Sequence, residues 1–278
     1  MRGHGGRRAR GAATLAALVL LAGCSSGSTT RPDAPPTGAT TGAAPDPTTA
    51  LRERCLSAIP ESADLEALTL DGRTGGEVEV ARVGPGSSTT VAVLLPQIGG
   101  LCGWGRWAAA AADEAGVTSL LVNPCGYGES TCPDDADADP LNEVAPAVAL
   151  AREDLGATRV VLLGTSMGGS LTVMAVAAGA DVDAWADVSG PPAWEGTDLA
   201  DLAPDLASDG VPDGLVVMAP SDGRAIFAAA RELAGRAGVP FVAGRSGHGW
   251  ELLVDPVEGT PTRIGRRLFA LAADTGRE

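Results

Sequence analysis

The sequence predicts an α/β protein with a mostly parallel, doubly wound sheet of about eight strands and helices on both faces. Several short, β-branched runs are apolar throughout, which is typical of parallel strands that are covered on both faces. Stretches of helical length separate these runs. Polar residues follow directly after several runs, at the sheet edge where doubly wound folds bind their ligands.

The first 23 residues are interpreted as an export signal that is removed. Residues 1–10 carry four arginines and no acid, and residues 11–23 form an apolar run too short to span a membrane as a stable helix. The run ends on Leu-Ala-Gly-Cys and resembles the lipobox of bacterial lipoproteins, which implies that Cys24 is lipidated and becomes the first mature residue. The alternative is an ordinary signal peptide with an incidental cysteine.

Residues 24–50 are expected to form a disordered tether. Ser, Thr, Gly, Pro and Ala dominate this segment, and it has too few large apolar groups to offset the entropy lost on ordering. Residues 51–278 are long enough for one domain with its own core. Together these segments predict an exported protein that a lipid at Cys24 holds on the extracytoplasmic face of the bacterial cell membrane.

The elements of the domain are expected in the following order. LEALTL and EVEVARVG flank the turn DGRTGG and predict an antiparallel hairpin. Six further strands are expected in STTVAVLLPQ, GVTSLLVNP, TRVVLLGTS, VDAWADVSG, GLVVMAPSDG and PFVAGRSG. Helices are expected at Trp104–Ala115, at about 140–155, and in SLTVMAVAAGA, GRAIFAAARELAGRAG and TPTRIGRRLFALAA. Residues 191–214 leave room for one short helix over the sheet edge, but not for a lid domain.

The charge of the chain limits its partners. A formal net charge of −15 argues against nucleic-acid binding, because an acidic domain repels the phosphate backbone. We expect no cofactor and no bound metal, and we favour a monomer. The acidic run CPDDADADP resembles half of a calcium loop, but Pro140 stands where that loop needs glycine, so a solvated loop is expected.

Four cysteines follow the lipidation site, and in an exported protein an even number predicts disulfides. They are Cys55, Cys102, Cys125 and Cys132. Of the three possible connectivities we favour Cys125–Cys132, which closes a short loop, together with Cys55–Cys102, which ties the N-terminal segment to the body of the domain. A zinc site is the alternative, but the C-x-x-C spacing is missing and only one histidine follows the signal segment.

The hexapeptide GTSMGG, residues 164–169, is the strongest indication of chemistry. It fits G-x-S-x-G and stands between an apolar run and a segment of helical pattern. In such a sharp turn, side chains at positions 164 and 168 would collide with the backbone, and Ser166 is held in a strained conformation with its hydroxyl above the sheet. The other interpretation is a glycine-rich turn that opens a helix.

A serine nucleophile needs a base and an orienting acid. His248 is the single histidine after the signal segment, and flanking glycines let its loop reach inward. Asp222 follows the LVVMA run and preserves the chain order Ser, Asp, His. Asp187, one strand earlier, is the rival acid, and Asp222 could instead cap the next helix.

Two backbone N–H groups are needed to stabilise the oxyanion of a tetrahedral intermediate. Met167, directly after the serine, is expected to supply one. The second is expected from Ile98 in the loop after VAVLLPQ, with Gln97 as the alternative. Four tryptophans are expected to border an open site: Trp104, Trp107, Trp194 and Trp250.

Over residues 60–275 the chain resembles serine hydrolases of the α/β-hydrolase fold. LLPQIGG resembles the family's LLHGxGG segment, NPCGYGES its D-x-R-G-x-G-x-S segment, and SGHGWELL its histidine loop. Pro96-Gln97 replaces His-Gly, and Asn123 and Cys125 replace Asp and Arg, which removes a common ion pair.

The resemblance implies an enzyme that cleaves carboxylic esters or related acyl bonds of a small substrate through an acyl-enzyme. Ser166 is then the nucleophile, His248 the base and Asp222 the acid that orients it. One alternative is an acyltransferase with the same residues. Another is a non-catalytic lipoprotein that keeps the fold as a binding module.

Overall fold

The computed structural model describes residues 45–208 and 210–274. The predicted export signal, Cys24 and the tether up to residue 44 lie outside the described residues. The first element of the described part is helix α1 (Pro47–Cys55), so residues 47–50, predicted to belong to the tether, form part of a helix. The reason is local, since Asp46 caps the helix and proline occupies its first position. None of the helices formed by these residues has the length and apolar character needed to cross a membrane.

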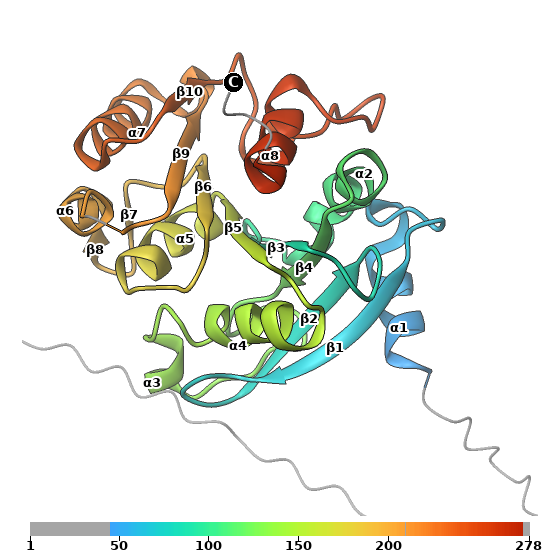
Figure 1. The fold of residues 1–278 in the computed structure, drawn as a ribbon. Coiled ribbons are helices and arrows are strands. Elements are labelled where there is room, and N and C mark those ends of the chain that lie inside the picture. The colour runs from blue at the N-terminus through green and yellow to red at the C-terminus, as the bar shows by residue number, and fades with distance from the viewer. Residues whose placement is uncertain (1–44, 209, 275–278) are drawn as a thin grey trace, which may run out of the picture. The chain divides into compact units, whose positions relative to one another are not determined.

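The eight predicted strands form one sheet, in the order β1-β2-β4-β3-β5-β6-β9-β10 (Figure 1). They are β1 (Leu65–Asp71), β2 (Glu77–Val83), β3 (Thr90–Leu95), β4 (Thr118–Val122), β5 (Arg159–Thr165), β6 (Ala184–Val188), β9 (Asp213–Met218) and β10 (Phe241–Ala243). Strand β2 pairs antiparallel with β1 and with β4, and all other pairs in this sheet are parallel. The predicted fold class is confirmed.

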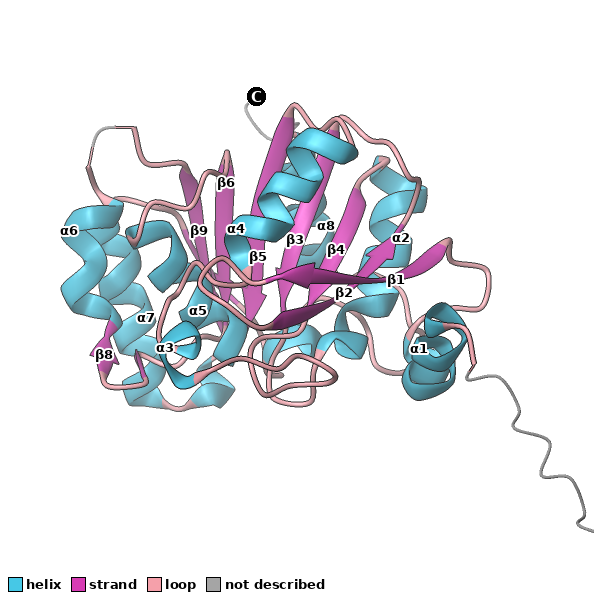
Figure 2. Cartoon of the chain, turned by 90° about the horizontal axis from the view of Figure 1, so that it is seen from below, coloured by secondary structure: helices cyan, strands magenta, loops and turns pink. Residues whose placement is uncertain are grey.

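Helices cover both faces of the sheet, and each face has its own apolar core (Figure 2). Helices α2 (Gly105–Ala115) and α8 (Arg263–Ala273) pack on one face. The helices on the other face are α4 (Val144–Ala149), α5 (Met167–Ala177) and α7 (Arg224–Ala237). Along β3, Ala92 and Leu94 join the first core and Val91 and Val93 join the second. The strand is therefore apolar at successive positions because both of its faces are buried.

The helix predicted at about 140–155 starts later than expected. Helix α4 begins at Val144 and continues as one π-helical turn over Leu150–Asp154. Pro146 falls in the first turn, where its missing N–H is not needed for a helical hydrogen bond.

Two segments differ in detail from the expectation. The acidic run, expected as a loop, contains a single helical turn, α3 (Asp134–Asp137). The segment between β6 and β9 contains a small hairpin, β7 (Ala193–Trp194) and β8 (Thr197–Asp198), then a 3₁₀ turn, η4 (Leu199–Leu202), and the short helix α6 (Ala203–Leu206). As far as the described residues extend, this segment forms no separate lid domain.

Both favoured disulfides are confirmed. Cys55–Cys102 joins α1 to the 3₁₀ helix η2 (Leu101–Trp104). Cys125–Cys132 closes the loop that follows β4.

Candidate active site

Ser166 occupies the turn between β5 and α5 in a conformation with positive φ, at φ 50° and ψ −119°. A Cβ at Gly164 would overlap with the carbonyl group of Gly168, and one at Gly168 would overlap with the carbonyl group of Leu95. The residues two before and two after the serine must therefore lack a side chain. The strained backbone is held by hydrogen bonds from the Ser166 N–H to Val188 O (2.8 Å) and from the Gly168 N–H to Pro96 O (2.9 Å).

His248 and Asp222 form a hydrogen-bonded pair, with 2.7 Å between Nδ1 of the ring and Oδ1 of the carboxylate. Asp222 ends the 3₁₀ turn η5 (Pro220–Asp222) after β9, and His248 precedes the 3₁₀ turn η6 (Gly249–Leu252) after β10. The Asp222 side chain is 9 % exposed and the His248 side chain 44 %. Since Nδ1 faces the carboxylate, Nε2 is directed away from it.

Asp222 does not cap helix α7, because the cap residue is Gly223 and no side chain accepts from the first turn. A second contact joins the same two loops. The Ser221 hydroxyl donates to Gly247 O (3.0 Å) and accepts from the Gly247 N–H (3.1 Å). Ser221 was not singled out from the sequence, although it directly precedes Asp222, because nothing in the chain indicates what its hydroxyl faces.

The rival acid, Asp187, makes no hydrogen bond or ion pair with His248 in the described part of the chain. It is 1 % exposed, and its Oδ1 accepts from the Gly190 N–H at 2.8 Å. Burial raises the pKa of this carboxyl to about 7. Its side chain lies beneath the first turn of α5, where a Cβ at Gly169 would overlap with Oδ1.

The histidine loop packs against the serine turn. A Cβ at Gly249 would lie 3.5 Å from the Cβ of Thr165, so the residue after His248 touches the residue before Ser166. The same Cβ would overlap with the Gln97 side chain, whose Oε1 accepts from the Trp250 N–H at 3.3 Å. The structure therefore brings together the segments that carry the predicted nucleophile, base and acid.

The two predicted oxyanion donors belong to segments that meet where the Gly168 N–H donates to Pro96 O. Met167 is the first residue of α5, and its N–H has no acceptor among the described residues. Ile98 lies in the loop after β3, and its side chain is 65 % exposed. In this loop Gly100 donates to Gln97 O at 3.2 Å, and the Ile98 N–H has no acceptor in the part of the chain that the structure describes.

Two of the four tryptophans expected at the site belong to the core. Trp104 and Trp107 are fully buried, and their Nε1 groups donate to Leu95 O (2.9 Å) and Gly265 O (3.1 Å). Trp104 packs against Trp107, and Trp107 packs against Phe269 of α8. Trp250, in contrast, lies against η2, where a Cβ at Gly103 would overlap with its ring, and close to Gly99 in the loop after β3, where a Cβ would lie 3.8 Å from the ring.

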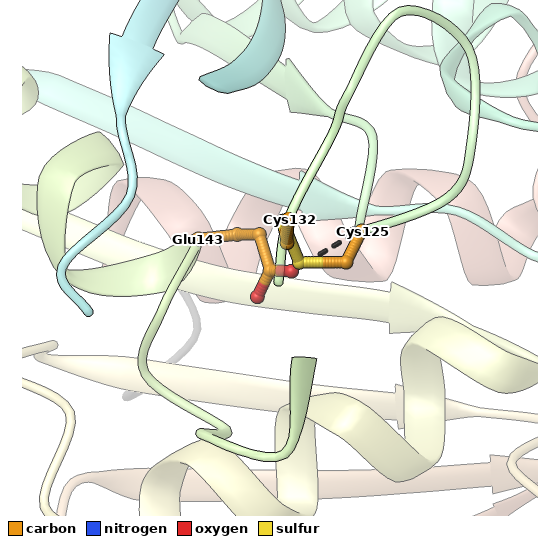
Figure 3. A group of neighbouring side chains, drawn as sticks. All are labelled: Cys125, Cys132 and Glu143. Atoms are coloured by element: carbon orange, nitrogen blue, oxygen red, sulfur yellow. Dashed lines mark hydrogen bonds between the residues drawn. A yellow bond between two sulfur atoms is a disulfide. The ribbon is translucent and has the colours of Figure 1, made fainter. Parts of the chain in front are cut away.

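A cavity of about 180 Å³ adjoins the serine turn. Its walls include Leu95, Tyr127, Glu143, Met167, Leu171 and Trp194. Glu143 Oε1 accepts from the Cys125 N–H at 2.9 Å, beside the Cys125–Cys132 disulfide (Figure 3). Burial raises the pKa of the Glu143 carboxyl.

Cys125, Cys132 and Glu143 are also the one group of potential metal ligands found in residues 45–208 and 210–274. Both sulfur atoms are joined in the disulfide, so neither is a thiolate that could bind zinc.

No protein-family model and no curated protein matches this sequence. Several solved structures are similar in fold. An esterase of Pyrococcus furiosus aligns with a TM-score of 0.59 at 11 % identity, over 79 % of this chain and 94 % of its own. A predicted CIB-like hydrolase of Thermoplasma acidophilum gives 0.57 at 19 % identity, over 77 % and 100 %. An esterase of Pyrobaculum calidifontis gives 0.54 at 18 % identity, over 82 % and 92 %. The chain has the α/β-hydrolase fold.

Proposed function

We propose that the protein is a serine hydrolase that cleaves carboxylic esters or related acyl bonds through an acyl-enzyme. The observation that carries the proposal is the His248–Asp222 pair on loops that pack against the strained turn of Ser166. The names of the structurally similar proteins, esterases among them, point in the same direction.

In the proposed reaction the Ser166 hydroxyl attacks the acyl carbonyl while Nε2 of His248 takes its proton. Asp222 accepts the Nδ1–H and stabilises the imidazolium that forms. The N–H groups of Met167 and Ile98 stabilise the oxyanion. The leaving group departs with the proton from Nε2. Water then gives a proton to Nε2 while its oxygen bonds to the acyl carbon. The bond between that carbon and Ser166 Oγ breaks, Oγ takes the proton back from Nε2, and the acid is released.

The acyl chain is assigned to the cavity beside Met167, because this residue directly follows the nucleophile. Because the cavity is small, we expect hydrolysis of short acyl chains, with kcat/KM falling as the acyl chain lengthens.

The deciding experiment is labelling of the purified protein with a fluorophosphonate probe. Wild type is expected to be labelled, and Ser166→Ala is expected to show no labelling and no hydrolysis of p-nitrophenyl esters. A non-catalytic binding protein would remain unlabelled. A panel of p-nitrophenyl esters of rising chain length tests the assignment of the cavity, and product analysis with and without an acceptor alcohol separates a hydrolase from an acyltransferase.

We also propose that Cys24 is lipidated after export and holds the enzyme on the extracytoplasmic face of the bacterial membrane, as the lipobox-like sequence implies. Metabolic labelling with a fatty acid tests this. Wild type is expected to carry the label and to fractionate with membranes, and Cys24→Ala to do neither.

A further inference from the structure

The segment NPCGYGES, residues 123–130, follows β4 and has no part in the reaction as proposed. Its first residue, Asn123, is 2 % exposed, although a buried carboxamide is costly unless its donor and acceptor are both satisfied. Asn123 Oδ1 accepts from the Leu101 N–H at 2.8 Å, and Nδ2 donates to Glu79 Oε2 at 2.6 Å. A backbone N–H on one side and a carboxylate on the other leave only one orientation for this amide.

Glu79 is itself fixed from several directions. It is a residue of β2 that is 7 % exposed, and it is paired with Arg54 of α1. Its Oε2 also accepts from the Glu129 N–H at 2.9 Å. The loop closes over the pair at Gly128, which has φ +56° and where a Cβ would overlap with both Asn123 Nδ2 and Glu79 Oε2.

The contact with Leu101 is made at the end of the loop that holds the proposed oxyanion donor. This oxyanion loop, residues 97–101, follows β3, carries Ile98 as its second residue and ends at Leu101, the first residue of η2. The Ile98 side chain is largely exposed and does not hold the loop in place. Gly100 approaches Asn123 closely, since a Cβ there would lie 3.0 Å from Oδ1. The position of the Ile98 N–H therefore depends on how the ends of the loop are held.

The contacts of Glu79 explain why positions 123 and 125 depart from the family's D-x-R-G-x-G-x-S pattern. An aspartate at position 123 would put one carboxylate against another, because Glu79 already supplies the negative charge. Arg54 supplies the positive charge that the pattern places at position 125. Arg54 also precedes Cys55, whose disulfide partner Cys102 follows Leu101. The Arg54–Glu79 ion pair and the Cys55–Cys102 disulfide thus both connect α1 to the end of the oxyanion loop.

We infer that Asn123, oriented by Glu79, is a positioning residue that places the oxyanion loop for acyl transfer. This inference rests on the proposed function, since the loop has a catalytic role only if Ser166 is the nucleophile. An oxyanion donor contributes mainly in the transition state, so its displacement lowers kcat more than it changes KM.

Asn123→Ala is expected to lower kcat for a short p-nitrophenyl ester about 10- to 100-fold with KM changed less than about threefold. Asn142→Ala is the matched control. Asn142 is another fully buried carboxamide, with hydrogen bonds to Thr74, Gly75 and the sulfur atoms of the Cys125–Cys132 disulfide, and it does not contact the oxyanion loop. It is expected to lose stability but to keep kcat within about threefold.

A charge exchange keeps the test independent of folding defects in Asn123→Ala. Asn123→Asp is expected to lose activity at pH 8 and to regain part of it at lower pH, where one of the two facing carboxylates is protonated. Adding Glu79→Gln to Asn123→Asp again gives one carboxylate and one carboxamide, with the two groups exchanged between positions 79 and 123. This double variant is expected to recover kcat at pH 8 at least tenfold over Asn123→Asp.

Fluorophosphonate labelling separates the two levels of the proposal. Wild type is expected to be labelled and Asn123→Ala to be labelled more slowly. Equal labelling rates, equal losses of kcat in Asn123→Ala and Asn142→Ala, or no recovery in the double variant would each overturn the positioning role and leave the serine mechanism intact. Absence of wild-type labelling would overturn both.

Discussion

Two aspartates at neighbouring strands, Asp187 at β6 and Asp222 beyond β9, have the same side chain in opposite environments. Strand β6 pairs with β9 in parallel, and Asp187 lies opposite Val216 within the paired region. Its side chain must therefore point to one face of the sheet, where α5 covers it. Asp222 stands four residues after the last residue of β9, in a 3₁₀ turn, and reaches the rim where His248 lies.

This difference shows that the position of an aspartate relative to the end of its strand decides whether its carboxylate is buried or can bind a histidine from another loop. Inside the strand, pleating fixes the direction of the side chain and burial raises the pKa of Asp187 to about 7. Past the strand end, the chain can turn and present the carboxylate to another loop. Asp222 Oδ2 is buried and has no hydrogen-bond partner among the described residues. The side-chain hydrogen bond of Asp222 is therefore the one between Oδ1 and His248.

The largest expected effect is on kcat/KM, when the carboxylate of Asp222 or of Asp187 is replaced by an amide. Asp222→Asn is expected to lower kcat/KM about 10³- to 10⁴-fold, because the amide no longer orients the imidazole in the required tautomer or stabilises its cation. Asp187→Asn is expected to keep kcat/KM within about threefold, since it does not contact the histidine. Ester hydrolysis at pH 8 measures both. Equal losses, or a larger loss in Asp187→Asn, would show that the acid was wrongly assigned.

The second largest expected effect is that of Asp187→Asn on the free energy of unfolding. Folded Asp187 holds its proton up to about pH 7, whereas an unfolded aspartate releases it near pH 4. The folded state binds more protons between these values, so this group lowers the free energy of unfolding as pH rises through that window. Asp187→Asn is expected to be more stable than wild type by roughly 2–4 kcal/mol at pH 8, and by much less at pH 4.5.

Denaturant unfolding at a series of pH values measures this difference. The exposed Asp113→Asn serves as the control and is expected to follow wild type at every pH. A stability difference between Asp187→Asn and wild type that does not vary with pH would contradict the burial of an acid with a raised pKa.

The smallest effect concerns the second link between the acid loop and the histidine loop. Ser221→Ala removes both hydrogen bonds to Gly247 and is expected to lower kcat about 3- to 10-fold, through looser placement of the imidazole. The unfolding midpoint should hardly change, because Ser221 is exposed. Ser208→Ala, which removes an exposed hydroxyl bonded to Asp205 O, is the control, and a kcat equal to it would show that the link has no catalytic effect.

Much of the fold follows from the sequence because its signals are local. Apolar runs covered on both faces mark the strands, and the six parallel ones fell where they were expected. The glycines at 164 and 168 are required by contacts within a few residues or with the adjacent strand, so the motif by itself indicates the turn. Helix α1 was overlooked, although Asp46 and Pro47 are a recognisable helix start, because the surrounding composition is that of a linker.

Other features depend on which side chains meet across the sheet, and the sequence alone does not contain them. Both Asp187 and Asp222 lie between Ser166 and His248 in the chain, so the order of residues does not choose between them. Packing decides, because it places Asp222 against His248 and buries Asp187 under α5. Trp107 is a core residue because α8 covers it, and Trp104 because it packs against Trp107. Asn123 meets Glu79 because β2 lies beside β4. The sequence determined the elements and the strained turn, whose causes lie within a few residues. Tertiary structure decided the partners, because each contact joins residues distant in the chain.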